Sequence, residues 1–245
     1  MNIWRAFSSI HCLTYLFPYL GVVMTPQVWI YLFLLLSATA YGVYNFRDLT
    51  LPYRLLIAQV FLVLLSEITS QVIRHFILSS FPVYYVLIPA LLLFNSLIYR
   101  TLFKSSIVLK EIVTIVAIIL LVIHWYLSLC TSEVWTESFP SISLMLLSLF
   151  TISVSLLVFI QMLYSPIMIP LQKQAIFWWN SGNLFFYSVT FFIFGYFRYI
   201  KGLGQNMPEW SYTQIWLASM VMYSCHFTSL YFNRKKSNLK NGNDQ

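Results

Sequence analysis

The chain has 245 residues, of which 60% are hydrophobic and 9% are charged. Soluble domains normally carry about 25% charged residues, so this composition excludes a soluble globule. It predicts instead an all-α polytopic transmembrane helical bundle. Stretches such as 28–36 and 115–123 are apolar on every side, which favours lipid-bathed helices over the alternating strands of a closed barrel.

We predict seven core spans and an N-terminal eighth within one transmembrane domain over residues 1–232. In chain order they lie at about 7–25, 28–46, 54–75, 81–101, 107–130, 140–164, 175–198 and 211–232. The first stretch contains Ser8, Ser9, His11 and Pro18, so it could span the membrane, re-enter it or lie at its surface. Residues 233–245 are predicted to form a disordered, basic and polar cytoplasmic tail.

Basic residues are distributed unevenly between the two ends of the predicted spans. With the C-terminus inside, the inner set is Arg5, Arg47, Arg54, Arg100, Lys104, Lys110, Lys173, Arg234, Lys235, Lys236 and Lys240, and the outer set is Arg74, Arg198 and Lys201. Because cytoplasmic loops carry an excess of Lys and Arg, this bias predicts a cytoplasmic C-terminus. The net charge of +7 therefore reflects membrane orientation, and we expect no nucleic-acid partner.

Glu67 is the one acidic residue well inside a predicted span. A charge at mid-bilayer costs about 2.5 to 3.5 kcal/mol on insertion scales, so such a residue is a candidate for function. Ser70, Gln71 and Arg74 follow it at i+3, i+4 and i+7 and share its helix face. This stripe could accept a proton, bind a cation or form an ion pair. It could also form only hydrogen bonds between helices.

The seventh predicted span carries a second polar face, formed by Asn180, Asn183, Tyr187 and Thr190 at spacings of three, four and three. Two amides, a phenol and a hydroxyl inside a membrane need partners from neighbouring helices, water or a ligand. Two interpretations remain open for these residues. They could line a polar ligand pocket that faces the bundle centre, or they could form only interhelical hydrogen bonds.

Other polar positions in the spans are typical of helix packing. His124 and His226 have no partner at metal-ligand spacing, so we expect them to make helix contacts. Ser148, Thr151 and Ser155 form a stripe of small residues, which close packing of membrane helices uses.

The sequence contains no HExxH motif, no Gly-rich phosphate loop, no CxxC motif and no paired carboxylates. Cys12, Cys130 and Cys225 are scattered and are expected to act as packing residues. We therefore predict no catalytic residues, no metal ligands and no cofactor. Pro89, inside the fourth span, predicts a kink in that helix.

Several short motifs stand out in the spans: Glu67, Pro82-Val83-Tyr84, Phe177-Trp178, Asn180-Ser181-Gly182, Phe186-Tyr187-Ser188 and Ile215-Trp216. With them, residues 28–232 resemble an uncharacterised family of small seven-helix membrane proteins from Bacteroidetes-type bacteria. The chain departs from that family's pattern at Leu91, Ser219 and Tyr223, where the pattern has an acid, a His and an Asn. The resemblance implies a multi-pass protein of the bacterial cytoplasmic (inner) membrane that accompanies sensor kinases.

Three functions are compatible with these features. We expect a non-enzymatic sensory or accessory module, with the lipid bilayer and a membrane or cytoplasmic signalling protein as its partners. The first alternative is a small proton- or cation-coupled transporter that uses Glu67. The second is an intramembrane lipid hydrolase, which would need clustered acids or histidines in the bundle.

Overall fold

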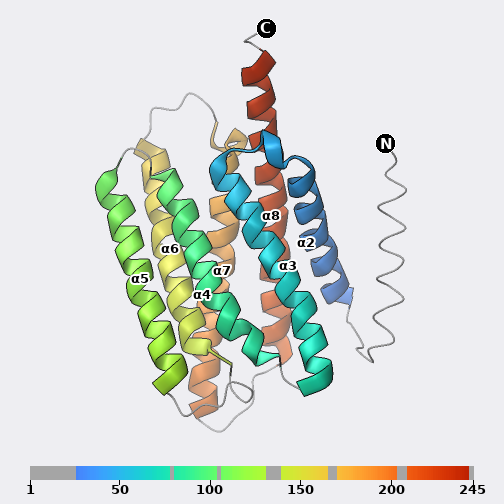
Figure 1. Ribbon diagram of the computed structural model, residues 1–245, viewed down its shortest axis with the longest axis vertical. Coiled ribbons are helices and arrows are strands. Elements are labelled where there is room, and N and C mark those ends of the chain that lie inside the picture. Colours follow the sequence, from blue (N-terminus) through green and yellow to red (C-terminus); the bar gives the residue numbers. More distant parts are fainter. Residues whose placement is uncertain are drawn as a thin grey trace.

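In the part of the chain that the computed structural model describes, seven α-helices run back and forth along one axis, each antiparallel to the next (Figure 1). The structure describes residues 26–77, 80–103, 106–130, 139–164, 170–202 and 209–242. Its helices are α2 (Pro26–Tyr44), α3 (Leu51–Ile77), α4 (Phe81–Leu102), α5 (Ile107–Cys130), α6 (Ser141–Tyr164), α7 (Ala175–Gly202) and α8 (Glu209–Gly242). Two 3-10 turns, η2 (Phe46–Asp48) and η3 (Leu171–Lys173), precede α3 and α7, and these described ranges contain no strand.

The all-α class predicted from the sequence is confirmed, and each of the seven expected core spans overlaps one helix. Four helices are long and apolar enough to cross a membrane, over Leu51–Ser70, Phe81–Leu102, Ile107–Leu129 and Ser141–Tyr164. The apolar part of α2 is shorter, at Trp29–Tyr44. The expected first span, 7–25, lies outside the described residues.

Six of the helices form a closed ring in the order α2, α3, α4, α6, α7, α8, with α8 packed back against α2. Helix α5 lies outside this ring against α4 and α6, and it is the least buried of the four candidate spans (Figure 1). The buried apolar cluster fills the ring and includes Leu35, Leu56, Tyr99, Leu147 and Leu230. Side chains from α4 and α7 can therefore meet in the middle of the bundle.

Gly182 explains how closely α7 and α8 approach each other. A Cβ atom at position 182 would lie 2.7 Å from the Cβ of Cys225 and 3.2 Å from the backbone oxygen of Met222. Real Cβ atoms essentially never approach another heavy atom to less than 3.0 Å, so only glycine fits this helix contact. Small residues at such contacts let two membrane helices pack with their backbones close together.

The helix order places the ends of α2, α4, α6 and α8 together with the starts of α3, α5 and α7 (Figure 1). Arg47, Arg54, Arg100, Lys110 and Lys173 consequently lie at one end of the bundle. We call this the basic end.

Helix α8 continues to Gly242, so most of the expected disordered tail is helical. Figure 1 shows this helix extending beyond the other helices. The residues after Asn233 contain no proline and include the good helix formers Lys and Arg, which lets the helix of the preceding span continue. Asn233 also ties α8 to the start of α3: its Oδ1 accepts from the Thr50 N–H at 3.3 Å, and its Nδ2 donates to the Thr50 hydroxyl at 3.4 Å.

Candidate functional site

Asn95 on α4 lies at the centre of a buried hydrogen-bond network. Its Oδ1 accepts from the Nε2 of Gln59 on α3 at 3.0 Å. Its Nδ2 donates to the hydroxyl of Thr151 on α6 and to the phenol oxygen of Tyr187 on α7, both at 3.2 Å. Asn95 is 0% exposed, and its one amide therefore joins four different helices.

One helical turn further along α4, Tyr99 continues the network. Its phenol lies 2.6 Å from the Ser155 hydroxyl on α6 and 3.5 Å from the Oδ1 of Asn180 on α7. Asn180 closes the triangle, because its Nδ2 donates to the Ser155 backbone oxygen at 2.8 Å. Asn95 and Tyr99 are four residues apart, so both project from the same face of α4 toward α6 and α7.

Asn183, one turn after Asn180, turns to α8 instead. Its Oδ1 lies 3.1 Å from the Nε2 of His226, and both side chains are buried. An amide oxygen only accepts, so His226 donates from Nε2. We call the combined set Gln59, Asn95, Tyr99, Thr151, Ser155, Asn180, Asn183, Tyr187 and His226 the central polar network.

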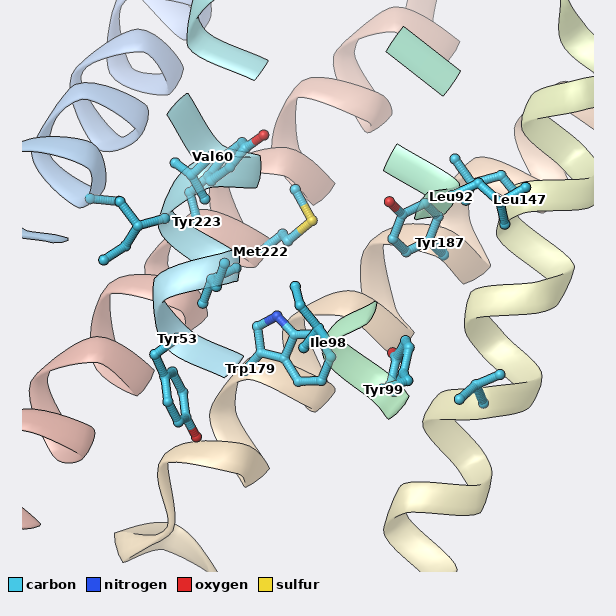
Figure 2. Packing of buried hydrophobic residues seen from close by; sticks show 14 of the residues in the cluster. Tyr53, Val60, Leu92, Ile98, Tyr99, Leu147, Trp179, Tyr187, Met222 and Tyr223 are labelled. Carbon is cyan, nitrogen blue, oxygen red and sulfur yellow. The ribbon is translucent and has the colours of Figure 1, made fainter. Parts of the chain in front are cut away.

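The central polar network is surrounded by apolar side chains. Figure 2 shows Tyr99 and Tyr187 among Leu92, Ile98 and Leu147, with Trp179 beside Ile98. The Trp179 ring lies 4.9 Å from the ring of Tyr99. Inside such an environment a polar atom without a partner is costly, since no bulk water can replace the lost hydrogen bond.

Four polar atoms along the network are nevertheless buried without a partner: Gln59 Oε1, Asn183 Nδ2, Thr190 Oγ1 and His226 Nδ1. These four atoms include hydrogen-bond donors and acceptors, and they lie on α3, α7 and α8. An amide or an imidazole with spare capacity can exchange one hydrogen-bond partner for another. The network is thus connected but incompletely satisfied, which makes a second arrangement of these helices less costly than in a fully bonded core.

Glu67 forms a second polar site, two helical turns after Gln59 on α3, and the Tyr223 ring, 5.7 Å from the His226 ring, links it to the central polar network. Its carboxylate accepts a hydrogen bond from the phenol of Tyr31 on α2 at 3.1 Å. The phenols of Tyr84 on α4 and Tyr223 on α8 also interact electrostatically with this carboxylate. The Tyr31 ring packs edge-on against Trp216 at 4.7 Å and against Tyr223 at 5.6 Å. Four helices therefore contribute to the surroundings of one acid.

The sequence-predicted residues fall into two groups. Asn180, Asn183 and Tyr187 meet in the central polar network, and the buried Thr190 lies one turn beyond them. Glu67 belongs to the second polar site, with Ser70 buried nearby and interacting with Tyr84. The side chains of Gln71 and Arg74 lie outside the described part of the structure.

Sequence reasoning missed Gln59, Asn95 and Tyr99. An amide inside an apolar span is the same signal that identified Asn180, and Gln59 and Asn95 both present it. The sequence indicated only a helix contact for His226 and only a packing role for Ser155. The helix contacts expected for His226 and His124 are present, His124 through its Nε2 and the Tyr85 backbone oxygen at 3.0 Å.

The chemistry that this arrangement supports is hydrogen-bond exchange and helix positioning. Among the described residues, no three His, Cys, Asp or Glu side chains lie close enough together to bind a metal ion. Amides, hydroxyls and phenols dominate the central polar network, and these groups both donate and accept hydrogen bonds.

Comparisons of the chain with protein-family models, with curated proteins and with solved structures find no match. The resemblance to the seven-helix bacterial family therefore rests on the short motifs alone and stays a prediction.

Proposed function

We propose that the protein is a non-enzymatic sensory or accessory module of the bacterial cytoplasmic membrane, which transmits a change inside the bilayer to a partner through a shift of α8. In this proposal the chain crosses the membrane seven or eight times and has a cytoplasmic C-terminus. The distribution of basic residues at the ends of the helices supports that orientation.

The observation that carries the proposal is the continuity of α8. Within one unbroken helix, Trp216 and Tyr223 pack against Tyr31 near Glu67, His226 joins the central polar network, and Asn233 contacts the start of α3. The same helix then extends past the bundle to Gly242. A rearrangement at either polar site would therefore change the position of the protruding end, where a partner can detect it.

A switch also needs two arrangements of similar free energy. Buried polar atoms without a partner support this, because they can form new hydrogen bonds in a second arrangement. In the described interior, Asn183 Nδ2 and His226 Nδ1 lie on the two sides of the α7–α8 contact and have no partner. Shifts of about 1–2 Å are typical of helices that transmit signals across an interface. A ligand, a lipid or a change in the bilayer that binds one arrangement better would shift the population toward it.

A distance measurement on α8 tests the proposal. Spin labels at the exposed positions Tyr44 and Tyr231, in a chain without native cysteines, report how α8 moves relative to α2. We expect His226→Phe to shift or broaden this distance by about 1–2 Å. Ser224→Ala is the matched control, because the exposed Ser224 hydroxyl bonds only its own helix at Met220.

Recovery of a partner is the second half of the test. We expect the full-length chain to co-purify from native membranes with a signalling protein, and a chain without residues 234–245 to lose that protein while keeping its helical content. Recovery of this chain alone, together with an α8 distance that His226→Phe leaves unchanged, would contradict the proposal.

A transporter coupled through Glu67 is the second candidate, and the surroundings of that residue favour it. Phenols of α2, α4 and α8 lie around the carboxylate. A carboxylate can bind a proton or a cation, and phenol oxygens and aromatic faces add further favourable contacts for a cation.

A further inference from the structure

A groove lies at the basic end between α3, α4 and α5, away from both polar sites. It has a volume of about 510 Å³ and is lined by Leu51, Leu55, Leu97, Arg100, Thr101 and Lys110. These residues come from the first turns of α3, the last turns of α4 and the first turn of α5. All three helices are candidate membrane spans, so the groove is located where apolar helix meets the polar edge of a bilayer.

The two parts of the groove differ in chemistry. Leu51, Leu55 and Leu97 form an apolar wall, and the Leu51 and Leu97 side chains are 60% and 46% exposed. Arg100 and Lys110 add two positive charges at its polar rim. The Thr101 hydroxyl donates to the Ile98 backbone oxygen at 2.6 Å, so it lines the groove with its hydrogen already used.

Glu111 lies beside this rim, and it leaves the Arg100 guanidinium incompletely paired. The Arg100 Nη2 lies 3.9 Å from the Glu111 carboxylate, and the two side chains are 48% and 57% exposed. A guanidinium has five N–H donors, and one carboxylate at this distance occupies few of them. Two cations and one acid leave a net positive rim, and the positive end of the α5 helix dipole lies at the same side.

We propose that this groove binds an anionic phospholipid, with its phosphate between Arg100 and Lys110 and one acyl chain along Leu51, Leu55 and Leu97. The net positive rim favours an anionic headgroup over a zwitterionic one, and the phosphate accepts hydrogen bonds from the guanidinium. The apolar wall selects a lipid over a free anion. Basic pockets between membrane helices at the cytoplasmic side are a known way of recognising such headgroups.

Lipid titration of the purified full-length protein, followed by native mass spectrometry, tests the site. We expect phosphatidylglycerol to bind more tightly than phosphatidylcholine. Arg100→Gln and Lys110→Gln should each weaken phosphatidylglycerol binding about fivefold, the effect expected for one cationic side chain near a lipid surface. Glu111→Gln should strengthen it, because the carboxylate competes for Arg100. Leu97→Asn should weaken both lipids.

Lys173→Gln is the matched control, because it removes an exposed positive charge at the basic end but outside the groove. Thermal unfolding of each variant checks that the bundle is intact. Inorganic phosphate should not displace the lipid, and displacement would instead assign a free-anion site. Equal binding of the two lipids, or wild-type phosphatidylglycerol affinity in both Arg100→Gln and Lys110→Gln, would overturn the proposal.

Discussion

His124 on α5 supplies the hydrogen bond that Pro89 on α4 cannot make. In a regular helix the N–H of residue 89 would donate to the backbone oxygen of Tyr85, but proline has no N–H. The Nε2 of His124 lies 3.0 Å from that same oxygen. Because a carbonyl only accepts, this nitrogen carries the proton. The imidazole thus bonds a carbonyl that Pro89 cannot bond, inside a candidate membrane span.

This relationship predicts that the importance of His124 depends on Pro89. His124→Phe should reduce the free energy of unfolding by about 1–3 kcal/mol, the usual cost of a buried group that loses its partner. In a Pro89→Ala background, the new N–H can bond the Tyr85 oxygen, so His124→Phe should cost much less. Reversible unfolding in mixed micelles measures both values. An equal cost in the two backgrounds would show that His124 stabilises α4 in some other way.

Asn95 should be the most sensitive position of the central polar network. Asn95→Leu removes the partner of Gln59, whose Oε1 is already unpaired, and we expect a loss of about 1–3 kcal/mol. The double variant with Gln59→Leu should lose less than the sum of the single variants, since no stranded amide remains. Unfolding measurements on the wild type, both single variants and the double variant give the coupling free energy between the two amides. We expect a value of about 0.6 kcal/mol, which is typical of membrane helices.

A matched control for that cycle is Ser153→Ala, on the same helix as Thr151. The Ser153 hydroxyl is exposed and bonds the Leu149 oxygen of its own helix. It should change stability little. Additive losses for Asn95→Leu and Gln59→Leu would show that the two amides do not depend on each other.

Two glycines of α7 should respond in opposite ways to the same change. Gly182→Ala places a Cβ 2.7 Å from that of Cys225, so we expect a loss of about 1–3 kcal/mol from overpacking. Gly195→Ala meets only the Met145 Cε at 3.6 Å, an ordinary contact. It should be neutral or stabilise the helix by up to about 1 kcal/mol. Thermal unfolding of the two variants side by side checks this, and equal effects would contradict a close α7–α8 contact.

Flux measurements distinguish the transporter from the sensory module. If Glu67 couples transport, liposomes with the wild-type protein should show proton- or cation-dependent flux that Glu67→Gln abolishes. Tyr31→Phe, which removes the phenol that donates to Glu67, should reduce it. Glu111→Gln is the control, since that carboxylate is 57% exposed at the basic end. Absence of wild-type flux would count against the transporter and leave the sensory proposal in place.

The helices could be predicted from sequence because an apolar stretch long enough to cross a membrane is typical of an α-helix. The polar face from Asn180 to Thr190 was predictable for a similar reason, since helical spacing determines which residues of one helix share a face. Spacing does not report which helices become neighbours. Asn95 therefore gave no sign that it would meet Gln59, Thr151 and Tyr187, because that meeting depends on how the ring closes.

The prediction of a disordered tail was wrong over residues 233–242, for a different reason. Composition after Asn233 is polar and charged, which is typical of disorder in an isolated segment. Helix propagation, however, needs no new nucleus once a helix already exists. The segment follows a stable helix that Asn233 holds at Thr50, so it continues that helix to Gly242.

The return of α8 to α2 and α3 has a consequence for biosynthesis. Tyr31 and Thr50 are synthesised early, but their partners Tyr223 and Asn233 emerge only with the final helix. Before α8 packs against the bundle, Asn183 also lacks His226. A chain that still lacks its last helix would therefore hold these polar groups without their partners. Completion of α8 is then the step that closes the ring and pairs them.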